Sequence, residues 1–355
     1  MTVRTIGVEE EFLLVDPDSG LPRAVAHLAL AARTDAELAG ELLREQLETA
    51  TRPCSTLEEL GGELRRARAE AGDAAAAAGA ALVALGTSPL PVDPTLSPKP
   101  RYREMRRRFG LTAAEELTCG CHVHVAVDSE DEGVGALDRI RPWLAPLLAL
   151  TANSPFWQGV DSGYASYRSQ VWSRWPSAGP YAPFGSSAGY HGAVGAMLGS
   201  DTVLDRGMVY YDARLSAEYP TVEVRIGDVC LDVDDAVLLA ALARGLVETA
   251  GREWRAGTPV DPVRLELLRL AAWRAGRSGV DGVLLDPCTW RPVPAREVLD
   301  QLVRHVAPAL EEAGDLPRVQ ELLSGVVHRG TGARAQRAAG DPRAAVALAV
   351  RRTHA

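Results

Sequence analysis

Lysine is almost absent from this 355-residue chain: of its 38 basic residues only Lys99, in the stretch "SPKPRY", is a lysine. A P-loop nucleotide site needs a lysine directly after its glycines, and a pyridoxal-phosphate enzyme needs a lysine for its Schiff base. Lys99 lies between two prolines, and no glycine-rich loop precedes it. The sequence therefore excludes both classes of enzyme.

Other common features are missing as well. No apolar run reaches the roughly 18–20 residues of a membrane span, and the start "MTVRTIGVEE" lacks the basic and apolar segments of a secretory signal. A net charge of −9 argues against nucleic acid as a partner. The five cysteines form no CxxC pair and are odd in number, which favours reduced thiols. We therefore expect a cytoplasmic protein that binds neither membranes nor nucleic acid.

What is present is typical of a globular protein, with 46% apolar and 24% charged residues. Alternating apolar and polar residues predict strands at 3–15, 117–128 and 220–229, and at the end of 35–51, a segment that begins like a helix. Longer periodic patterns predict helices at 55–86, with Ser55 as its N-cap, and at 101–109, 133–152, 232–250 and over much of 261–355. No repeat or linker is evident, so we expect residues 1–355 to form a single α+β domain.

The first predicted strand contains "GVEEEF", with three consecutive carboxylates. The period of two in a strand puts Glu9 and Glu11 on one face and Glu10 on the other. Neighbouring like charges repel by roughly 4 kcal/mol per pair at about 4 Å and an effective dielectric near 20. This strand therefore needs either a bound cation or open water beside it, and the stretch alone does not decide between them.

A second predicted strand, "CGCHVHVAV", places His122 and His124 on one face and Cys121 on the other. A zinc site that combines cysteine and histidine is therefore not expected. The two histidines fit a cation site, and they equally fit simple hydrogen bonding near the surface.

Two further strands have the same design. "TVEVRIGD" places Glu223 and Arg225 on one face, where a plain ion pair is the alternative to a functional role. "EQLETAT" places Gln46 and Glu48 on one face. Four such strands predict a curved, mainly antiparallel sheet with helices on its outer face and a charged concave side.

The polar faces together offer an oxygen-rich set of ligands with one imidazole, which suits Mg²⁺ or Mn²⁺ better than zinc. The candidate metal ligands are Glu9, Glu11, Glu48, His122 and Glu223. Two or three divalent ions would relieve the repulsion among the four carboxylates. By the same reasoning, Glu223→Ala should leave the metal-free protein equally or more stable.

Several blocks resemble, in order and over essentially the whole chain, the bacterial carboxylate–amine ligases of the glutamate–cysteine ligase type 2 family. These blocks are "GVEEEFLLVD", "EQLETATRPC", "CGCHVHV", "NSPFWQGVDSGYASYRSQVWSRWP", "YYDARLSAEYPTVEVRIGDVCLDVDDAV" and "HRGTGARAQR". The same pattern is more distantly similar to glutamine synthetase. The resemblance implies a glutamine synthetase-like catalytic domain that binds ATP with two or three Mg²⁺ ions, acts on small-molecule amino-acid substrates and forms homodimers or other homo-oligomers.

The resemblance also implies roles for individual residues. It makes the five candidate ligands metal-binding, and it places Arg225 on the transferring γ-phosphate and His124 beside the nucleotide or the substrate carboxylate. It assigns Arg168 and Arg214 to the substrate carboxylate and phosphate, and Arg334 to the nucleotide. The implied reaction phosphorylates a carboxylate with ATP, after which an amine attacks the acyl phosphate and releases phosphate beside an amide. γ-Glutamylcysteine is the product that the family name implies, although nothing in the sequence reads as a cysteine pocket.

Two other functions remain open at this point. A metal-dependent amidohydrolase also carries HxH on a strand, but it needs that motif near its first strand and often a metal-bridging lysine. A non-catalytic metal- or nucleotide-binding protein is the other alternative. The aromatic residues that crowd 156–190 fit either a loop packed by its own rings or a lid that keeps water from the acyl phosphate.

Overall fold

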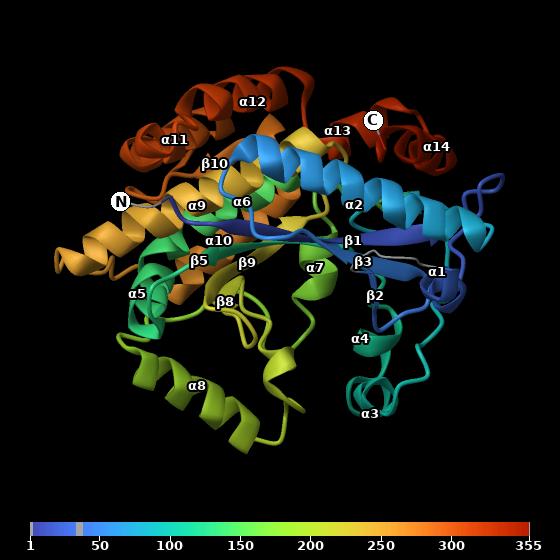
Figure 1. Cartoon of the computed structure of the whole chain (residues 1–355), viewed down its shortest axis with the longest axis horizontal. Coiled ribbons are helices and arrows are strands. Elements are labelled where there is room, and N and C mark those ends of the chain that lie inside the picture. Colours follow the sequence, from blue (N-terminus) through green and yellow to red (C-terminus); the bar gives the residue numbers. More distant parts are fainter. Residues whose placement is uncertain (1–2, 33–37, 355) are drawn as a thin grey trace.

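The computed structural model describes residues 3–32 and 38–354 of the chain. A seven-stranded sheet runs through its centre in the order β2-β3-β1-β5-β9-β8, with β4 paired to β1 (Figure 1). All paired strands of this sheet are antiparallel, so the predicted α+β architecture is confirmed. Its strands are β1 (Ile6–Val15), β2 (Leu38–Gly40), β3 (Gln46–Ala50), β4 (Ala81–Val83), β5 (Gly120–Ala126), β8 (Ala213–Leu215) and β9 (Thr221–Asp228).

Helices pack on one face of the sheet, and other elements border the opposite face. α2 (Leu57–Ala77), α6 (Leu144–Thr151) and α9 (Val233–Arg255) contact the strands directly. In Figure 1, α2, α11 (Ala295–Ala313) and α12 (Leu316–Arg329) lie above the sheet, whereas α3 (Pro100–Phe109), α4 (Leu111–Ala114) and α8 (Ser187–Gly199) lie below it.

The remaining elements connect these layers. Two small hairpins are formed by β6 (Phe156–Trp157) with β7 (Val160–Asp161) and by β10 (Val283–Leu285) with β11 (Pro292–Pro294). The remaining α-helices are α1 (Ala26–Ala32), α5 (Glu130–Ile140), α7 (Arg168–Trp172), α10 (Leu265–Ser278), α13 (Gly332–Ala338) and α14 (Pro342–Arg352). Short 3₁₀ turns span Arg141–Trp143, Arg206–Met208 and Gly279–Asp281.

The long helix predicted over 55–86 is shorter than expected at both ends. α2 begins at Leu57, and its N-cap is Thr56, which exchanges two hydrogen bonds of 3.1 Å with Glu59 in a capping box. The helix ends at Ala77, shortly before Gly79, whose φ of +71° L-residues rarely adopt. The following stretch forms β4 against β1, because pairing there buries its apolar side chains.

Two other expected helices also differ. The helical start expected within 35–51 is wrong for the described residues, because Leu38–Gly40 forms strand β2 against β3; residues 35–37 lie outside the described part. The helix expected over 133–152 is divided into α5 and α6 by the turn at Arg141–Trp143. The proline in this turn lacks the backbone N–H that a continuous helix would use as a hydrogen-bond donor.

The alternation predicted for β1 is confirmed by the partners of its central glutamates. Glu10 points toward α2, where Arg68 binds its carboxylate at 2.6 and 2.9 Å in a fully buried ion pair. Cys121, Val123 and Val224 lie in the core on the same side of the sheet. Glu9 and Glu11 therefore face the opposite side, away from α2 and α9.

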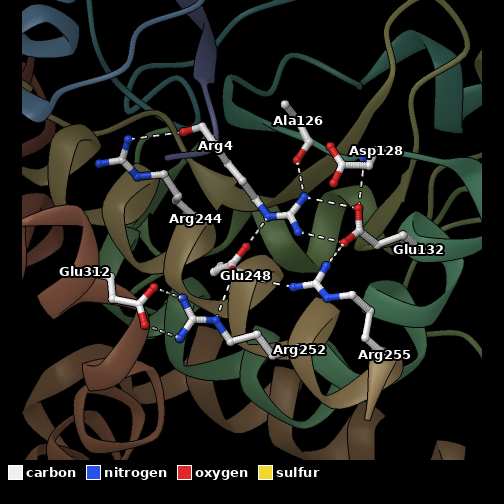
Figure 2. Close-up of polar contacts among 9 residues, drawn as sticks. All are labelled: Arg4, Ala126, Asp128, Glu132, Arg244, Glu248, Arg252, Arg255 and Glu312. Carbon is white, nitrogen blue, oxygen red and sulfur yellow. Dashed lines mark hydrogen bonds and ion pairs between the residues drawn. The ribbon is translucent and has the colours of Figure 1, made fainter. Parts of the chain in front are cut away.

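A charged network attaches the N-terminal segment to α5 and α9, as Figure 2 shows. The Arg4 guanidinium binds Glu132 at 2.8 Å and Glu248 at 2.6 Å. Further contacts extend the network through Ala126, Asp128, Arg244, Arg252, Arg255 and Glu312. The pairing of opposite charges fixes the start of β1 to the helical layer. Across residues 3–32 and 38–354, none of the helices is long and apolar enough to cross a lipid bilayer.

Candidate metal and ligase site

The strand registers bring the predicted ligands to one face of the sheet. Glu9 is the direct partner of His122 in the β1–β5 ladder, and Glu11 is the direct partner of Glu48 in the β1–β3 ladder. Glu223 lies opposite His124 in the β5–β9 ladder. Four strands that are far apart in the sequence therefore contribute to one polar surface, as the alternating patterns predicted.

A first cluster contains three carboxylates. Ligand oxygens of Glu11, Glu41 and Glu48 all lie within 4.8 Å of one another. Sequence reasoning missed Glu41, because the segment before Glu48 was read as the start of a helix. In the β2–β3 hairpin Ala39 pairs with Glu48, so the period of two places Glu41 on the same face. Reading 38–50 as a hairpin would have found it.

A second cluster combines carboxylates and imidazoles. Ligand atoms of Glu9, His124 and Glu223 lie within 4.8 Å of one another, and Nε2 of His124 is 3.3 Å from Oε1 of Glu9. Nδ1 of His122 is 3.5 Å from the other oxygen of Glu9. Both ring nitrogens of His122 are buried and have no hydrogen-bond partner in the described part of the chain. The structure thus brings both histidines to Glu9, although the sequence analysis expected only His122 to be a ligand.

The electrostatics of the two clusters differ. Burial and the neighbouring Glu41 raise the pKa of Glu11 to about 7, and burial with three nearby carboxylates raises the pKa of Glu48 well above its ordinary value. Although burial opposes it, contact with the two histidines lowers the pKa of Glu9. Burial and the charge of Arg225 lower the pKa of His122 to about 4, so that imidazole is neutral at physiological pH. A neutral imidazole is the form that binds metal ions.

Glu223 is held by two arginines. Its carboxylate binds Arg214 at 2.7 Å and also contacts Arg225, and these charges outweigh burial and lower its pKa to about 2. These two ion pairs argue against the expectation that Glu223→Ala would leave the metal-free protein equally or more stable. Removal of the carboxylate would leave two largely buried guanidinium groups without their partner, which is costly.

Two cavities open at the clusters. The first, of ≈ 280 Å³, is lined by Glu11, Glu41, His122 and Arg225 and bordered by α3. The second, of ≈ 540 Å³, is bordered by α8 and by the turn between β8 and β9. Glu9, Glu48 and Arg214 line both, so the metal clusters lie where the two cavities meet. Volumes of this size suit small-molecule ligands.

Of the other two predicted arginines, Arg168 lies near the first cluster, because its charge opposes the rise in the pKa of Glu11. Arg168, at the start of α7, lines a third cavity, and it packs so closely on Gly120 that a side chain at that position would collide with it. Arg334, near the start of α13, forms an ion pair with Asp281. Figure 1 shows α13 on the side of the sheet opposite α3 and α8. The structure therefore does not bring Arg334 to the clusters.

The aromatic stretch is packed by its own rings, as one of the two interpretations expected. Tyr181 stacks on Phe184 at 5.2 Å between ring centroids, and the ring of Tyr190 lies 5.0 Å from that of Phe184. Trp172 and Trp175 also line the cavity at the metal clusters. The role of the stretch as a lid stays a prediction.

Comparisons with known proteins place this chain among the ligases that form carbon–nitrogen bonds. The profile of glutamate-cysteine ligase family 2 matches residues 5–345, and the chain belongs to that family.

Its relatives agree with this assignment. A protein of Frankia alni, provisionally named glutamate–cysteine ligase 2-2, is 55% identical over 95% of this chain and 92% of its own length. A Streptomyces coelicolor protein, provisionally named glutamate–cysteine ligase 2, is 54% identical over 99% of this chain and its own full length. Among solved structures, the glutamate–cysteine ligase of Francisella tularensis in complex with AMP has a TM-score of 0.66 at 13% identity, and the match covers 99% of this chain and 89% of that one. This likeness confirms the predicted fold class.

Proposed function

We propose that the chain is an ATP-dependent carboxylate–amine ligase that activates the carboxylate of an amino acid as an acyl phosphate. The observation that carries the proposal is the pair of ligand clusters that meet beside Arg225 on one sheet face. Cysteine as the amine substrate, with γ-glutamylcysteine as product, is what the names of the relatives suggest.

The residues of both clusters fit Mg²⁺ or Mn²⁺. Glu11, Glu41 and Glu48 would hold one ion, and Glu9 and Glu223 would hold another with an imidazole. The orphaned ring nitrogens of His122 support this fit, because buried nitrogens without partners are rare. When bound, divalent ions supply the positive charge that a transferring phosphoryl group requires.

The chain supplies further positive charge of its own. The guanidinium groups of Arg225 and Arg214 lie beside Glu223 and line the cavity at the clusters. Negative charge spreads over the phosphoryl oxygens during transfer, and fixed arginines stabilise it without any covalent enzyme intermediate. The carboxylate oxygen attacks the γ-phosphorus and ADP leaves. The amine then attacks the acyl carbon, and phosphate leaves. The departing phosphate keeps the former carboxylate oxygen that was bonded to its phosphorus.

The 540 Å³ cavity is the best candidate for the nucleotide. It lies next to the clusters and is lined by His124, Tyr219 and Arg206, which offer rings and positive charge. The AMP complex of the Francisella structure supports a nucleotide in this fold.

We extend the proposal to the whole molecule. Both large clusters of core residues pack on the one central sheet, which supports a single catalytic domain over residues 1–355. We retain a cytoplasmic homodimer or other homo-oligomer as the expected state.

Calorimetry and turnover test the proposal. Wild-type protein should bind Mg·ATP, and Glu48→Gln should lose that binding, whereas the exposed control Glu266→Gln should keep it. Turnover with a panel of amino-acid pairs, followed by phosphate release and mass spectrometry, should yield an amide and ADP. Absence of Mg·ATP binding would overturn the proposal, and Mg·ATP binding without an amide product from any pair would favour the non-catalytic alternative.

A further inference from the structure

A third cavity, of ≈ 470 Å³, lies beside the metal clusters and is not explained by the metal or the nucleotide. Trp172 and Trp175 line it as well as the cavity at the clusters, so these rings form a shared wall. Its other walls come from the segment after α7, from β9 and from α10. The volume is that of a site for a small organic molecule.

The cavity contains the carboxyl group of a residue whose backbone is held in place on both sides. The backbone N–H of Asp212 donates to the carbonyl of Gly179 at 3.0 Å, and the carbonyl of Asp212 accepts from the N–H of Arg225 at 2.8 Å. Its carboxylate has no hydrogen-bond partner among the described residues and lines the cavity. Burial raises the pKa of this carboxyl to about 7, although the charge of Arg168 opposes the shift. A ligand with a positive charge would stabilise its ionised form.

Arg168 also lines this cavity, and its guanidinium, which packs against Gly120, has unsatisfied hydrogen-bond donors. Arg168 is 1% exposed, and its Nε and Nη2 have no acceptor among the described residues. Its Nη1 reaches only the carbonyl of Ile226, at a long 3.5 Å. A buried guanidinium with unsatisfied donors is unfavourable, and a carboxylate that accepts hydrogen bonds from it is its best complement.

Most of the rest of the wall is apolar or aromatic, and Arg174 and Arg269 are further charged residues in it. Trp172, Trp175 and Trp273 line it together with Pro176 and Pro180. Such a surface suits an apolar or aromatic side chain and offers more room than the side chain of cysteine would fill.

We propose that this cavity binds the α-amino acid that supplies the amine, with its carboxylate on Arg168, its amino group on Asp212 and an apolar or aromatic side chain against the tryptophans. The inference rests on the ligase function proposed above. One backbone hydrogen bond connects Asp212 to Arg225, so an amino group there lies next to the strand that carries the metal cluster. The other substrate has to present its carboxylate to the metal ions, so it occupies the 280 Å³ cavity and leaves this one for the amine.

Tryptophan fluorescence tests the inference without turnover, because three of the seven tryptophans line the cavity. In titrations without metal or ATP, L-phenylalanine or L-leucine should quench the fluorescence saturably. Phenethylamine and 3-phenylpropionate, which lack one charged group each, should bind about 10–100-fold more weakly, since each loses a charge-assisted hydrogen bond. L-Cysteine should bind more weakly than L-phenylalanine.

Variants locate the binding. Asp212→Asn, which keeps the shape of the side chain, should weaken binding about 10–100-fold, whereas the exposed control Asp201→Asn should not change it. Arg168→Met should also weaken it, and circular dichroism shows whether that buried substitution still folds. Equal affinity for the two analogues, tighter binding of cysteine, unchanged affinity of Asp212→Asn or no saturable quenching would each overturn the inference.

The same experiment separates this inference from the proposed function. Glu48→Gln, which should lose Mg·ATP, should still bind the amino acid as wild type does. Loss of amino-acid binding in Glu48→Gln would place the ligand at the metal clusters and overturn the inference. Failure of wild-type protein to bind Mg·ATP would instead overturn the proposed function and leave amino-acid binding in the third cavity as a separate result.

Discussion

Glu11 lies directly opposite Glu48 in the β1–β3 ladder, and their carboxylates converge with that of Glu41 within 4.8 Å. Like charges directly opposite each other on neighbouring strands are destabilising. Burial adds to this cost, as the raised pKa values of Glu11 and Glu48 indicate. The metal-free sheet therefore carries an unfavourable arrangement that a cation would relieve.

Mg²⁺ or Mn²⁺ should raise the melting temperature of the protein, because ions that bind the folded state alone stabilise it. At a free ion concentration about 100 times Kd the gain is about 2.7 kcal/mol. Glu48→Gln should melt at the same or a higher temperature than wild type without metal, and it should lose most of the response to metal. Differential scanning calorimetry with and without EDTA measures both effects, and Glu266→Gln is the control. An unchanged wild-type melting temperature in millimolar Mg²⁺ would contradict the metal site.

Glu223→Ala should lower both stability and turnover. Its carboxylate neutralises the guanidinium groups of Arg214 and Arg225, and breaking a buried pair by removing one partner typically costs about 3–5 kcal/mol. Urea denaturation of the metal-free protein should show this loss, and kcat should fall with it. If Glu223 were only structural, turnover per folded molecule would stay near the wild-type value.

Arg225→Lys should lower kcat by about 10²–10³ and change the KM for ATP much less, because the developing phosphoryl charge is met mainly in the transition state. Lysine keeps a positive charge beside Glu223, so the fold should survive. Steady-state kinetics at saturating Mg·ATP provide the comparison, with the exposed Arg264→Lys as control. A rise in KM with unchanged kcat would assign Arg225 to ground-state binding instead.

Glu116 should give the protein a pH-dependent stability. Its carboxyl lines the metal cavity, accepts a hydrogen bond of 3.0 Å from Thr118 and has a second oxygen without a partner among the described residues. Burial raises its pKa to about 7, so its contribution to stability is fully present below its ordinary pKa near 4.5 and is lost as the pH rises through about 7.

The stability of wild type should therefore fall relative to Glu116→Gln by up to about 3 kcal/mol between pH 5 and pH 8. Denaturation curves of both proteins at several pH values measure this difference, because titrations shared by the two proteins cancel. If the free energy of unfolding changed equally with pH in both proteins over that range, Glu116 would not titrate there.

The sequence predicted the parts of the site that obey strand periodicity. Glu9, Glu11, Glu48, His122 and Glu223 meet because each lies on the polar face of a strand, and the period of two is a local property. Glu41 was missed because the short strand before it is stabilised by pairing with β3, which local pattern does not reveal.

Tertiary packing decides the remaining features. Asp212 and Arg168 come together only because the loop before β8 and the start of α7 are packed beside β9. The end of α2 was likewise misjudged, since an alanine-rich stretch with good helix propensity is followed by apolar residues that pair with β1 instead.

The most direct test of the account follows one oxygen atom. The amino acids of the substrate panel would be labelled with ¹⁸O in their carboxylates, and the phosphate released with the amide would be examined by mass spectrometry. If the carboxylate is activated as an acyl phosphate, each amide formed transfers one ¹⁸O to phosphate, and ADP is the other product. Amide formation with unlabelled phosphate, or with AMP and pyrophosphate, would contradict the mechanism proposed for this site.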